Sequence, residues 1–111
     1  MIEICNLKNE KIKYPYDVKV DRRSSILGNP FYMHNENERN LVCDKYKEWF
    51  YRLLKENDSL ILHELNVLIK KYKIYGKLRL FCWCYPKHCH AETIKEFLED
   101  YINNKRDVYY V

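Results

Sequence analysis

A short apolar strand that runs directly into a cysteine-rich turn is the feature that most limits how this chain can fold. The apolar run that follows the break at Gly76 consists of Leu78, Leu80, Phe81 and Trp83. Pro86 ends the strand, and an amphipathic helical pattern begins at Cys89 or His90. The free N–H groups at a helix start favour anions and lower thiol pKa values. The sequence therefore predicts a strand, a turn suited to chemistry and a helix in succession.

Hydrophobic periodicity predicts the other elements. Alternation predicts strands over residues 1–6 and 16–20, and a helical period begins at about Glu38. The segment Asn57–Ser59 ends this first helix and caps a second one, which stops at Gly76. The resulting order is β-β-α-α-β-α. This order predicts a small α/β domain with an open, Rossmann-like sheet flanked by helices.

Two further segments complete the chain. Residues 21–34 lack a period and have a loop composition, and a loop of this length in a small domain is typically functional or flexible. Asp107–Val111 is compatible with an extra edge strand. No stretch has the composition of a linker, so we expect residues 1–111 to form a single domain.

Composition limits the class of protein. Hydrophobic residues make up 47% of the chain, which argues against disorder, and no apolar run approaches the ~20 residues of a membrane span. The five cysteines occur without a secretory signal, so we expect reduced thiols and an intracellular protein. The net charge of +4 favours an anionic ligand only weakly. The lysines of residues 70–77 suit the end of a helix, so specific nucleic-acid binding is not favoured.

The loop before the first helix holds residue types that bind phosphates and bases. The candidates are Arg22, Arg23, Ser25, Gly28, Asn29 and Phe31. Arginine offers a planar fork for phosphate, while serine and glycine supply short donors and open backbone. An amide held extended before proline can read a ligand edge, and an aromatic ring can stack on a base. The alternative interpretation is a solvated turn, because no phosphate-loop or dinucleotide glycine pattern is present.

The cysteine turn also allows a thiolate nucleophile. Cys89 at a helix N-terminus, between His88 and His90, has surroundings that lower a thiol pKa. Because adjacent helical residues do not face each other, a base would come from His88 across the turn, or from His34 or Glu92 by a tertiary contact. The competing interpretation, in which Cys89 only caps or packs the turn, is slightly favoured.

Zinc binding is the alternative for the same turn. The suitable ligands are Cys82, Cys84, Cys89 and His90. Only one residue separates Cys82 from Cys84, and Cys89 and His90 are adjacent. These spacings would strain a tetrahedral zinc site. A zinc cofactor is therefore not favoured, and the sequence identifies no other cofactor.

Two motifs in order give the chain a family resemblance. The motifs are formed by Arg23, Ser25 and Gly28–Phe31, and by Cys82–Cys84, Pro86, Cys89, His90 and Glu92. This pattern resembles an uncharacterised bacterial and phage family, a domain-of-unknown-function group with the signature GNPF … CWC.P..CH.(D/E). The resemblance covers nearly the whole chain and implies a compact α/β domain common in phage genomes. It also implies a protein of the bacterial or phage-infected cytoplasm, and it brings no established reaction.

The first functional hypothesis is a pocket for a nucleotide-like anion between the loop and the cysteine turn. Arg22 or Arg23 and the N-terminus of the last helix would hold phosphate, and Asn29 would read the base. Trp83 and Cys84 of the turn would line the same pocket. The reaction class is transfer or cleavage at a nucleoside or nucleotide, with Glu92, His90 and Cys89 as the candidate catalytic residues.

The second hypothesis is a non-enzymatic phage anti-defence protein. Such a protein would sequester a signal nucleotide or block a host enzyme, and its partner would be a small molecule or a host protein. The two hypotheses differ in whether a bound small molecule is consumed or only held.

Overall fold

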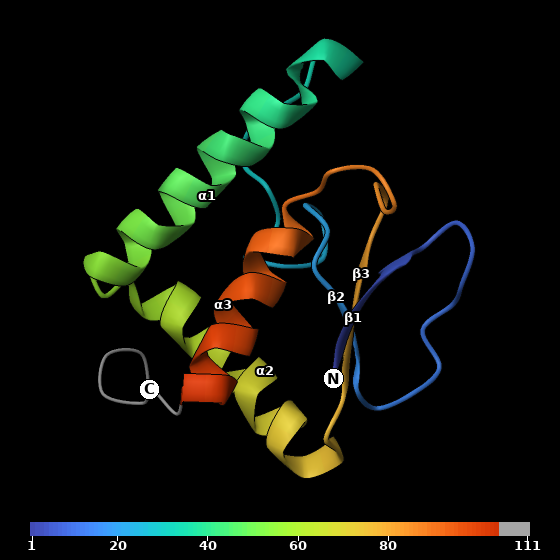
Figure 1. Cartoon of the computed structure of the whole chain (residues 1–111), viewed down its shortest axis with the longest axis vertical. Helices are drawn as coiled ribbons and strands as arrows, with labels where there is room; N and C mark the ends of the chain where they lie inside the picture. Colours follow the sequence, from blue (N-terminus) through green and yellow to red (C-terminus); the bar gives the residue numbers. More distant parts are fainter. Residues whose placement is uncertain (105–111) are drawn as a thin grey trace.

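Three parallel strands form the sheet, and the last strand in the chain lies at its centre. The strands are β1 (Ile2–Asn6), β2 (Asp17–Lys19) and β3 (Leu78–Cys82). The computed structural model describes residues 1–104 and orders the strands β1-β3-β2 (Figure 1). Leu80 lies opposite both Ile4 of β1 and Val18 of β2. Because the strands run in one direction, their carboxyl ends meet at one edge of the sheet.

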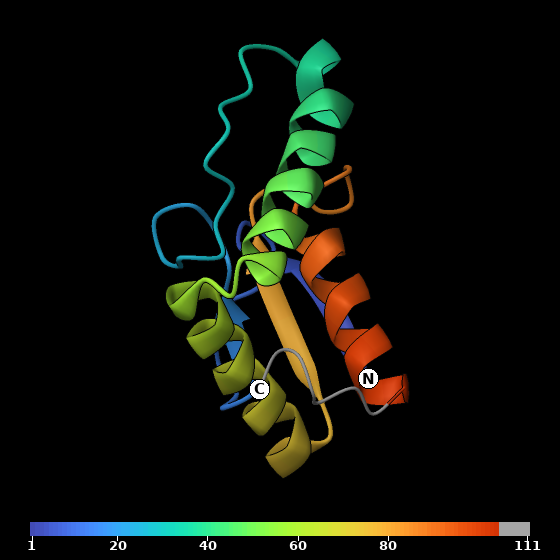
Figure 2. The ribbon, with the colours of Figure 1, turned by 90° about the vertical axis from the view of Figure 1, so that its left-hand side faces the viewer.

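Three helices and a short 3-10 turn form the second layer. They are η1 (Glu36–Glu38), α1 (Arg39–Lys55), α2 (Ser59–Tyr75) and α3 (Ala91–Asn104). Figures 1 and 2 show the three helices on one face of the sheet and the β1–β2 connection on the other. The Asp58 carboxylate accepts a hydrogen bond from the Ile61 N–H (3.0 Å) in the first turn of α2, and Gly76 ends that helix with a φ of 71°. The predicted β-β-α-α-β-α order and open α/β sheet are confirmed.

The side chains of β3 alternate between the two faces of the sheet. Leu78, Leu80 and Cys82 join the hydrophobic core beneath the helices. The largest helical side chains buried in that core include Tyr46, Phe50, Leu65, Leu68, Ile94 and Leu98. Burying each such side chain contributes roughly 1.5–3 kcal/mol relative to leaving it exposed. The core therefore fixes the place where the chain turns after Cys82.

The opposite face of β3 carries a buried ion pair. Arg79 donates to Asp17 of β2 (Nε to Oδ1, 2.8 Å) and to Glu10 of the β1–β2 connection (Nη1 to Oε1, 2.7 Å). Burial by itself raises the Asp17 pKa, but hydrogen bonds from Arg79 and from the N–H groups of Lys13 and Tyr14 lower it to about 2. The ion pair thus holds the β1–β2 connection against the sheet.

The boundaries agree closely with the sequence pattern. α3 begins at Ala91, one or two residues after the predicted start at Cys89 or His90, because i to i+3 hydrogen bonds close the preceding turn. The edge strand considered for Asp107–Val111 lies outside the residues that the structure describes. Within residues 1–104, no helix combines the length and the apolar character needed to cross a membrane.

Candidate functional site

The loop after β2 and the cysteine turn after β3 line one cavity of about 300 Å³. The sequence-predicted residues that line it are Arg22, Asn29, Phe31, Trp83, Cys84, Cys89 and His90. Arg39 and Val42 of α1 also contribute to its wall. Two segments that are distant in the sequence therefore meet beyond the carboxyl end of the central strand, as the first hypothesis expects.

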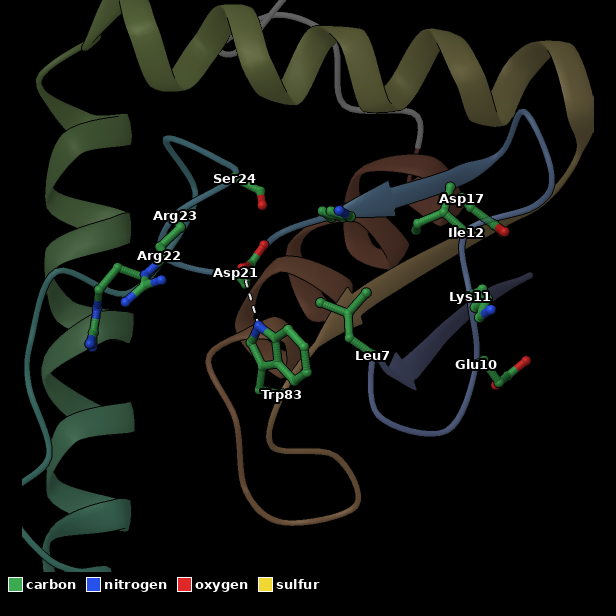
Figure 3. A pocket seen from close by; sticks show the side chains of 11 residues that line it. Leu7, Glu10, Lys11, Ile12, Asp17, Asp21, Arg22, Arg23, Ser24 and Trp83 are labelled. Atoms are coloured by element: carbon green, nitrogen blue, oxygen red, sulfur yellow. Dashed lines mark hydrogen bonds between the residues drawn. The ribbon is translucent and has the colours of Figure 1, made fainter.

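A wider groove of about 910 Å³ adjoins this cavity (Figure 3). It lies between the β1–β2 connection and residues 21–24. Its cationic side chains are Lys11, Lys19, Arg22 and Arg23. Asp21, Arg22 and Trp83 line both the cavity and the groove, so these three residues stand between the two hollows.

Asp21 is the buried carboxylate at this boundary. The residue is 8% exposed, and its Oδ2 accepts a hydrogen bond from the Trp83 indole N–H at 3.2 Å (Figure 3). Its Oδ1 is buried and has no hydrogen-bond partner among residues 1–104. A buried carboxylate oxygen without a donor costs free energy. This oxygen can therefore accept a hydrogen bond from a ligand.

Arg22 holds the predicted ligand loop in place. Its Nε donates to the Asn29 carbonyl and its Nη2 donates to the Phe31 carbonyl, both at 2.7 Å. The guanidinium carbon also lies 4.1 Å from the centroid of the Tyr32 ring. These contacts leave Nη1 without a hydrogen bond in the described part of the chain, so Nη1 is the group of Arg22 that can bind an anion.

Asn29 and Phe31 shape this loop as well as lining the cavity. The Asn29 Oδ1 accepts a hydrogen bond from the Phe31 N–H at 2.9 Å, which closes an Asx turn. The Phe31 ring meets the ring of Trp49 edge-on, with centroids 6.5 Å apart. The predicted base-reading role of Asn29 therefore falls to its amide NH₂ group, because its oxygen serves the loop.

Three other predicted loop residues do not line the cavity. Arg23 lines the groove, and the Ser25 Oγ accepts a hydrogen bond from the Leu27 N–H at 3.0 Å. A Cβ at Gly28 would lie 2.4 Å from the Cα of Arg22, so a side chain does not fit where the loop passes over the backbone. Ser25 and Gly28 therefore have a role in the structure of the loop.

Three thiols converge at the cysteine turn. The Cys82 and Cys84 thiols both interact electrostatically with the Cys89 thiol, and the Arg39 guanidinium interacts with Cys84. The interaction with Cys89, supported by Arg39, lowers the pKa of Cys84 to about 6. Its interactions with the other two thiols, together with burial, raise the pKa of Cys89 far above the usual thiol range. The expectation of a lowered Cys89 pKa is therefore wrong, and the acidic thiol in the cavity is Cys84.

His90 is buried behind the thiols. Its Nε2 donates to the Val20 carbonyl at 2.6 Å, and its Nδ1 lies 3.5 Å from the Cys89 sulfur. Burial lowers the pKa of His90, so the ring is neutral at neutral pH. The role of His90 as a proton carrier stays a prediction.

Glu92 caps α3 and does not line the cavity. Its Oε2 accepts a hydrogen bond from the Cys89 N–H at 3.1 Å, and its Oε1 lies 3.8 Å from the His88 Nε2. The carboxylate side chain is 48% exposed. Its acid–base role also stays a prediction, while its position accounts for a capping role.

The alternative zinc site at the turn stays a prediction. Among the residues that the structure describes, no group of three or more His, Cys, Asp or Glu side chains is arranged to hold a metal ion. His90, one of the alternative ligands, directs its ring nitrogens at the Val20 carbonyl and the Cys89 sulfur. The thiols are therefore best described by their contacts with one another and with Arg39.

Asp21 and Arg39 are site residues that the sequence reasoning missed. Asp21 comes just after β2 ends, and polar residues beyond the carboxyl ends of parallel strands are common ligand contacts, so this signal could have found it. Arg39 opens α1 and meets Cys84 only through the tertiary fold. No local pattern distinguishes it from the other cations of the helix.

The fold and the two hollows define a small α/β domain with a candidate ligand site at the carboxyl edge of a parallel sheet. The model of a protein family described as a domain of unknown function (DUF4326) matches residues 5–100. The chain therefore belongs to the DUF4326 family, which confirms the resemblance to an uncharacterised domain-of-unknown-function group. No curated protein and no solved structure matches the chain.

Proposed function

We propose that this domain binds a nucleotide-like anionic ligand at the carboxyl edge of its sheet. The observation that carries the proposal is the buried Asp21 Oδ1, which lacks a partner among residues 1–104 and lies where Arg22 and Trp83 line both hollows. A carboxylate, a guanidinium and an indole match the three parts of a nucleotide, namely its hydroxyl or amino donors, its phosphate and its planar base. Parallel α/β sheets bind ligands at this edge.

The smaller cavity suits the base or the sugar. Its volume of about 300 Å³ lies at the lower end of the range for ligand pockets, which is roughly 300–1,000 Å³. Trp83 and Tyr32 are exposed, so their rings are available for stacking. We therefore place the base or sugar in this cavity, with a donor group directed at the Asp21 Oδ1.

The wider groove suits the phosphate. The cations Lys11, Lys19, Arg22 and Arg23 line it without salt bridges to the described residues, whereas its carboxylates Glu10 and Asp17 already pair with Arg79. The groove therefore carries unpaired positive charge, which attracts phosphate. The N-terminus of α3 is a weaker site for phosphate, because the Glu92 carboxylate already accepts the N–H of Cys89 there.

The proposed reaction class is transfer or cleavage at the bound nucleoside or nucleotide. Asp21 is the carboxylate of the cavity, and we assign it the acid–base role that the sequence suggested for Glu92. His90 and Cys89 remain the other candidate proton carriers, since both line the same cavity.

Isothermal titration with adenosine, guanosine, cytidine and uridine monophosphates tests this proposal. We expect Asp21→Asn to weaken binding of the preferred nucleotide by roughly tenfold or more, because one charge-assisted hydrogen bond is lost. Arg23→Gln should weaken it less, and mainly at low salt. Asp44→Asn, which alters an exposed carboxylate of α1, is the matched control and should bind like the parent. The proposal fails if none of the four nucleotides binds, or if Asp21→Asn leaves the affinity unchanged.

A non-enzymatic protein that sequesters a signal nucleotide is the second candidate. The observation that favours it is a group of exposed aromatic and apolar side chains near the cavity, namely Tyr32, Met33, Trp83 and Tyr85. Chromatography of the nucleotide after incubation separates the candidates, because an enzyme converts it and a sequestering protein returns it intact. A protein that blocks a host enzyme would instead bind that enzyme, and the Asp21→Asn variant would still bind it.

A further inference from the structure

The cavity contains one thiol that combines access with an adjacent cation. Cys84 is half-buried and lines the cavity, whereas Cys82 is 1% exposed and lies in the core. Arg39 also lines the cavity, and its positive charge favours the thiolate form of Cys84. A small reagent that enters the cavity therefore meets Cys84 beside a positive charge.

Arg39 is held in this position from two sides. Its Nε and Nη2 bond to the Glu36 carboxylate at 2.8 and 2.7 Å, and its Nη1 donates to the His88 carbonyl at 3.1 Å. A guanidinium fixed by three hydrogen bonds needs little reordering to stabilise a thiolate. The Arg39 guanidinium is thus held in a fixed position in the cavity wall.

The titratable and charged groups around Cys84 come from every adjoining element. They are Glu36 of η1, Arg39 and Cys43 of α1, Cys82 of β3, and Cys89 before α3. Glu36 opposes ionisation of Cys84, while the interactions with Cys89 and Arg39 favour it and lower its pKa to about 6. The lowered pKa of Cys84 thus favours its thiolate, while the raised pKa of Cys89 favours its protonated form.

We propose that Cys84 is the nucleophile of a thiol–disulfide exchange site that takes a small disulfide as substrate, with Cys89 as the resolving thiol. The proposal uses the same cavity but does not rest on nucleotide binding. It is supported by the cavity itself, because Cys84, Cys89 and Arg39 all line it and a small disulfide that enters it meets both thiols and the guanidinium.

The exchange proceeds in two balanced steps. First, the Cys84 thiolate attacks one sulfur of the disulfide RSSR, which forms a mixed disulfide and breaks the original S–S bond to release RS⁻. Next, Cys89 gives up its proton to the released RS⁻ and attacks the Cys84 sulfur, which expels the second RS⁻. The products are a Cys84–Cys89 disulfide, RSH and RS⁻, so two electrons pass from the protein thiols to the small disulfide.

Oxidised glutathione and the full reduced chain provide the test, with peptide mass spectrometry as the readout. We expect the parent protein to form the Cys84–Cys89 disulfide, and the Cys89→Ser variant to accumulate glutathione on Cys84. Cys84→Ser should abolish both products. Modification that occurs first at Cys5 or Cys43 would overturn the proposal, and an internal disulfide that still forms in Cys89→Ser would overturn the role of Cys89.

Alkylation of the unmodified protein by iodoacetamide keeps the proposal testable if a variant folds poorly. The rate at Cys84 should rise with a midpoint near pH 6, because the thiolate is the reactive form, and should level off above it. A midpoint near the ordinary thiol value of about 8.5 would overturn the proposal. A zinc ion retained by the purified protein that blocks alkylation of Cys84 would also overturn it.

Arg39→Gln tests the role of the cation. We expect this change to move the alkylation midpoint upward and to slow the reaction below pH 7 by roughly tenfold, with a smaller loss for Arg39→Lys, which retains the charge. Arg52→Gln, which changes an exposed arginine of the same helix, is the matched control and should react like the parent. An unchanged midpoint in Arg39→Gln would contradict the assigned role of Arg39.

Discussion

The start of β2 and the loop just past its end each carry a buried aspartate, and the two are partnered in opposite ways. Asp17 and Asp21 are both 8% exposed. Asp17 accepts hydrogen bonds from Arg79 and from two backbone N–H groups. Asp21 accepts one from Trp83 through Oδ2, and its Oδ1 has no partner within residues 1–104.

This difference separates a carboxylate whose oxygens are used by the fold from one with an oxygen left for a ligand, which burial alone does not. A carboxylate whose oxygens are both satisfied contributes to the fold, and removing it leaves an arginine uncompensated. A carboxylate left partly unsatisfied makes the fold less stable than it could be. We therefore expect the two aspartates to respond to the same substitution in opposite ways.

The largest effect is expected at the structural aspartate. Asp17→Asn leaves Arg79 buried without its main counter-ion, and removal of one partner of a buried pair costs about 3–5 kcal/mol of unfolding free energy. Urea denaturation followed by circular dichroism measures this loss. Glu10→Gln is the control, because Glu10 is 41% exposed and an exposed ion-pair partner contributes much less to stability than a buried one. Equal losses for the two variants would contradict the comparison.

Gly28→Ala tests the close packing of the loop that carries Asn29 and Phe31 to the cavity. The added Cβ would lie 2.4 Å from the Arg22 Cα, so backbone must move, and we expect a loss of about 2–3 kcal/mol. Gly76→Ala is the control, since its Cβ would meet nothing within 4 Å, and its φ of 71° predicts a loss of about 1 kcal/mol. Thermal unfolding compares the two, and a larger loss at Gly76 would refute this account of Gly28.

Lowering the pH tests the role of Asp17 in the unmodified chain, without any change in the shape of its side chain. The Asp17 pKa is lowered to about 2 from its ordinary value of 3.8, so the stabilisation that Asp17 provides is fully present above about pH 4 and is lost as the pH falls towards 2. The shift corresponds to about 2 kcal/mol. Urea titrations from pH 5 to pH 2 should show this loss in the parent chain, and a much smaller one in Asp17→Asn. Parallel pH profiles would count against Asp17 as the acid-sensitive group.

The smallest effect on stability is expected at Asp21, the partly unsatisfied aspartate. Asp21→Asn removes a buried charge that lacks a full set of donors, while its Oδ1 can still accept the Trp83 hydrogen bond. We expect the unfolding free energy to stay constant or to rise by up to about 1 kcal/mol. Chemical denaturation beside Asp17→Asn makes the contrast direct. A loss comparable to that of Asp17→Asn would show that Asp21 is structural too.

The elements of the fold could be predicted because their signals are local. The alternation over residues 1–6, the helical period after Glu38 and the break at Gly76 each mark an element where the structure has one. The meeting of the loop with the cysteine turn was also predictable, because both follow the carboxyl ends of strands, where ligands commonly bind in α/β sheets.

The chemistry of the site could not be predicted in the same way, because partners decide it. Which thiol is acidic depends on Arg39, which lies far from Cys84 in the sequence, and on the interaction with Cys89. The missing partner of Asp21 is a property of the folded surroundings and has no sequence pattern. The acid–base role predicted for Glu92 is untested, while the hydrogen bond that its carboxylate accepts from the Cys89 N–H gives it a capping role that depends on the fold.

The contacts that order the loop around Gly28 affect the entropy of ligand binding. Three contacts hold this short segment. Gly28 packs closely against the Arg22 backbone, and the Arg22 side chain makes two hydrogen bonds to the segment. The Tyr46 hydroxyl donates to the Leu27 carbonyl at 2.6 Å. Such a segment is ordered when the chain folds, so a ligand does not have to order it again. We therefore expect the segment to keep one shape before and after a ligand binds. Binding should then cost the protein little conformational entropy.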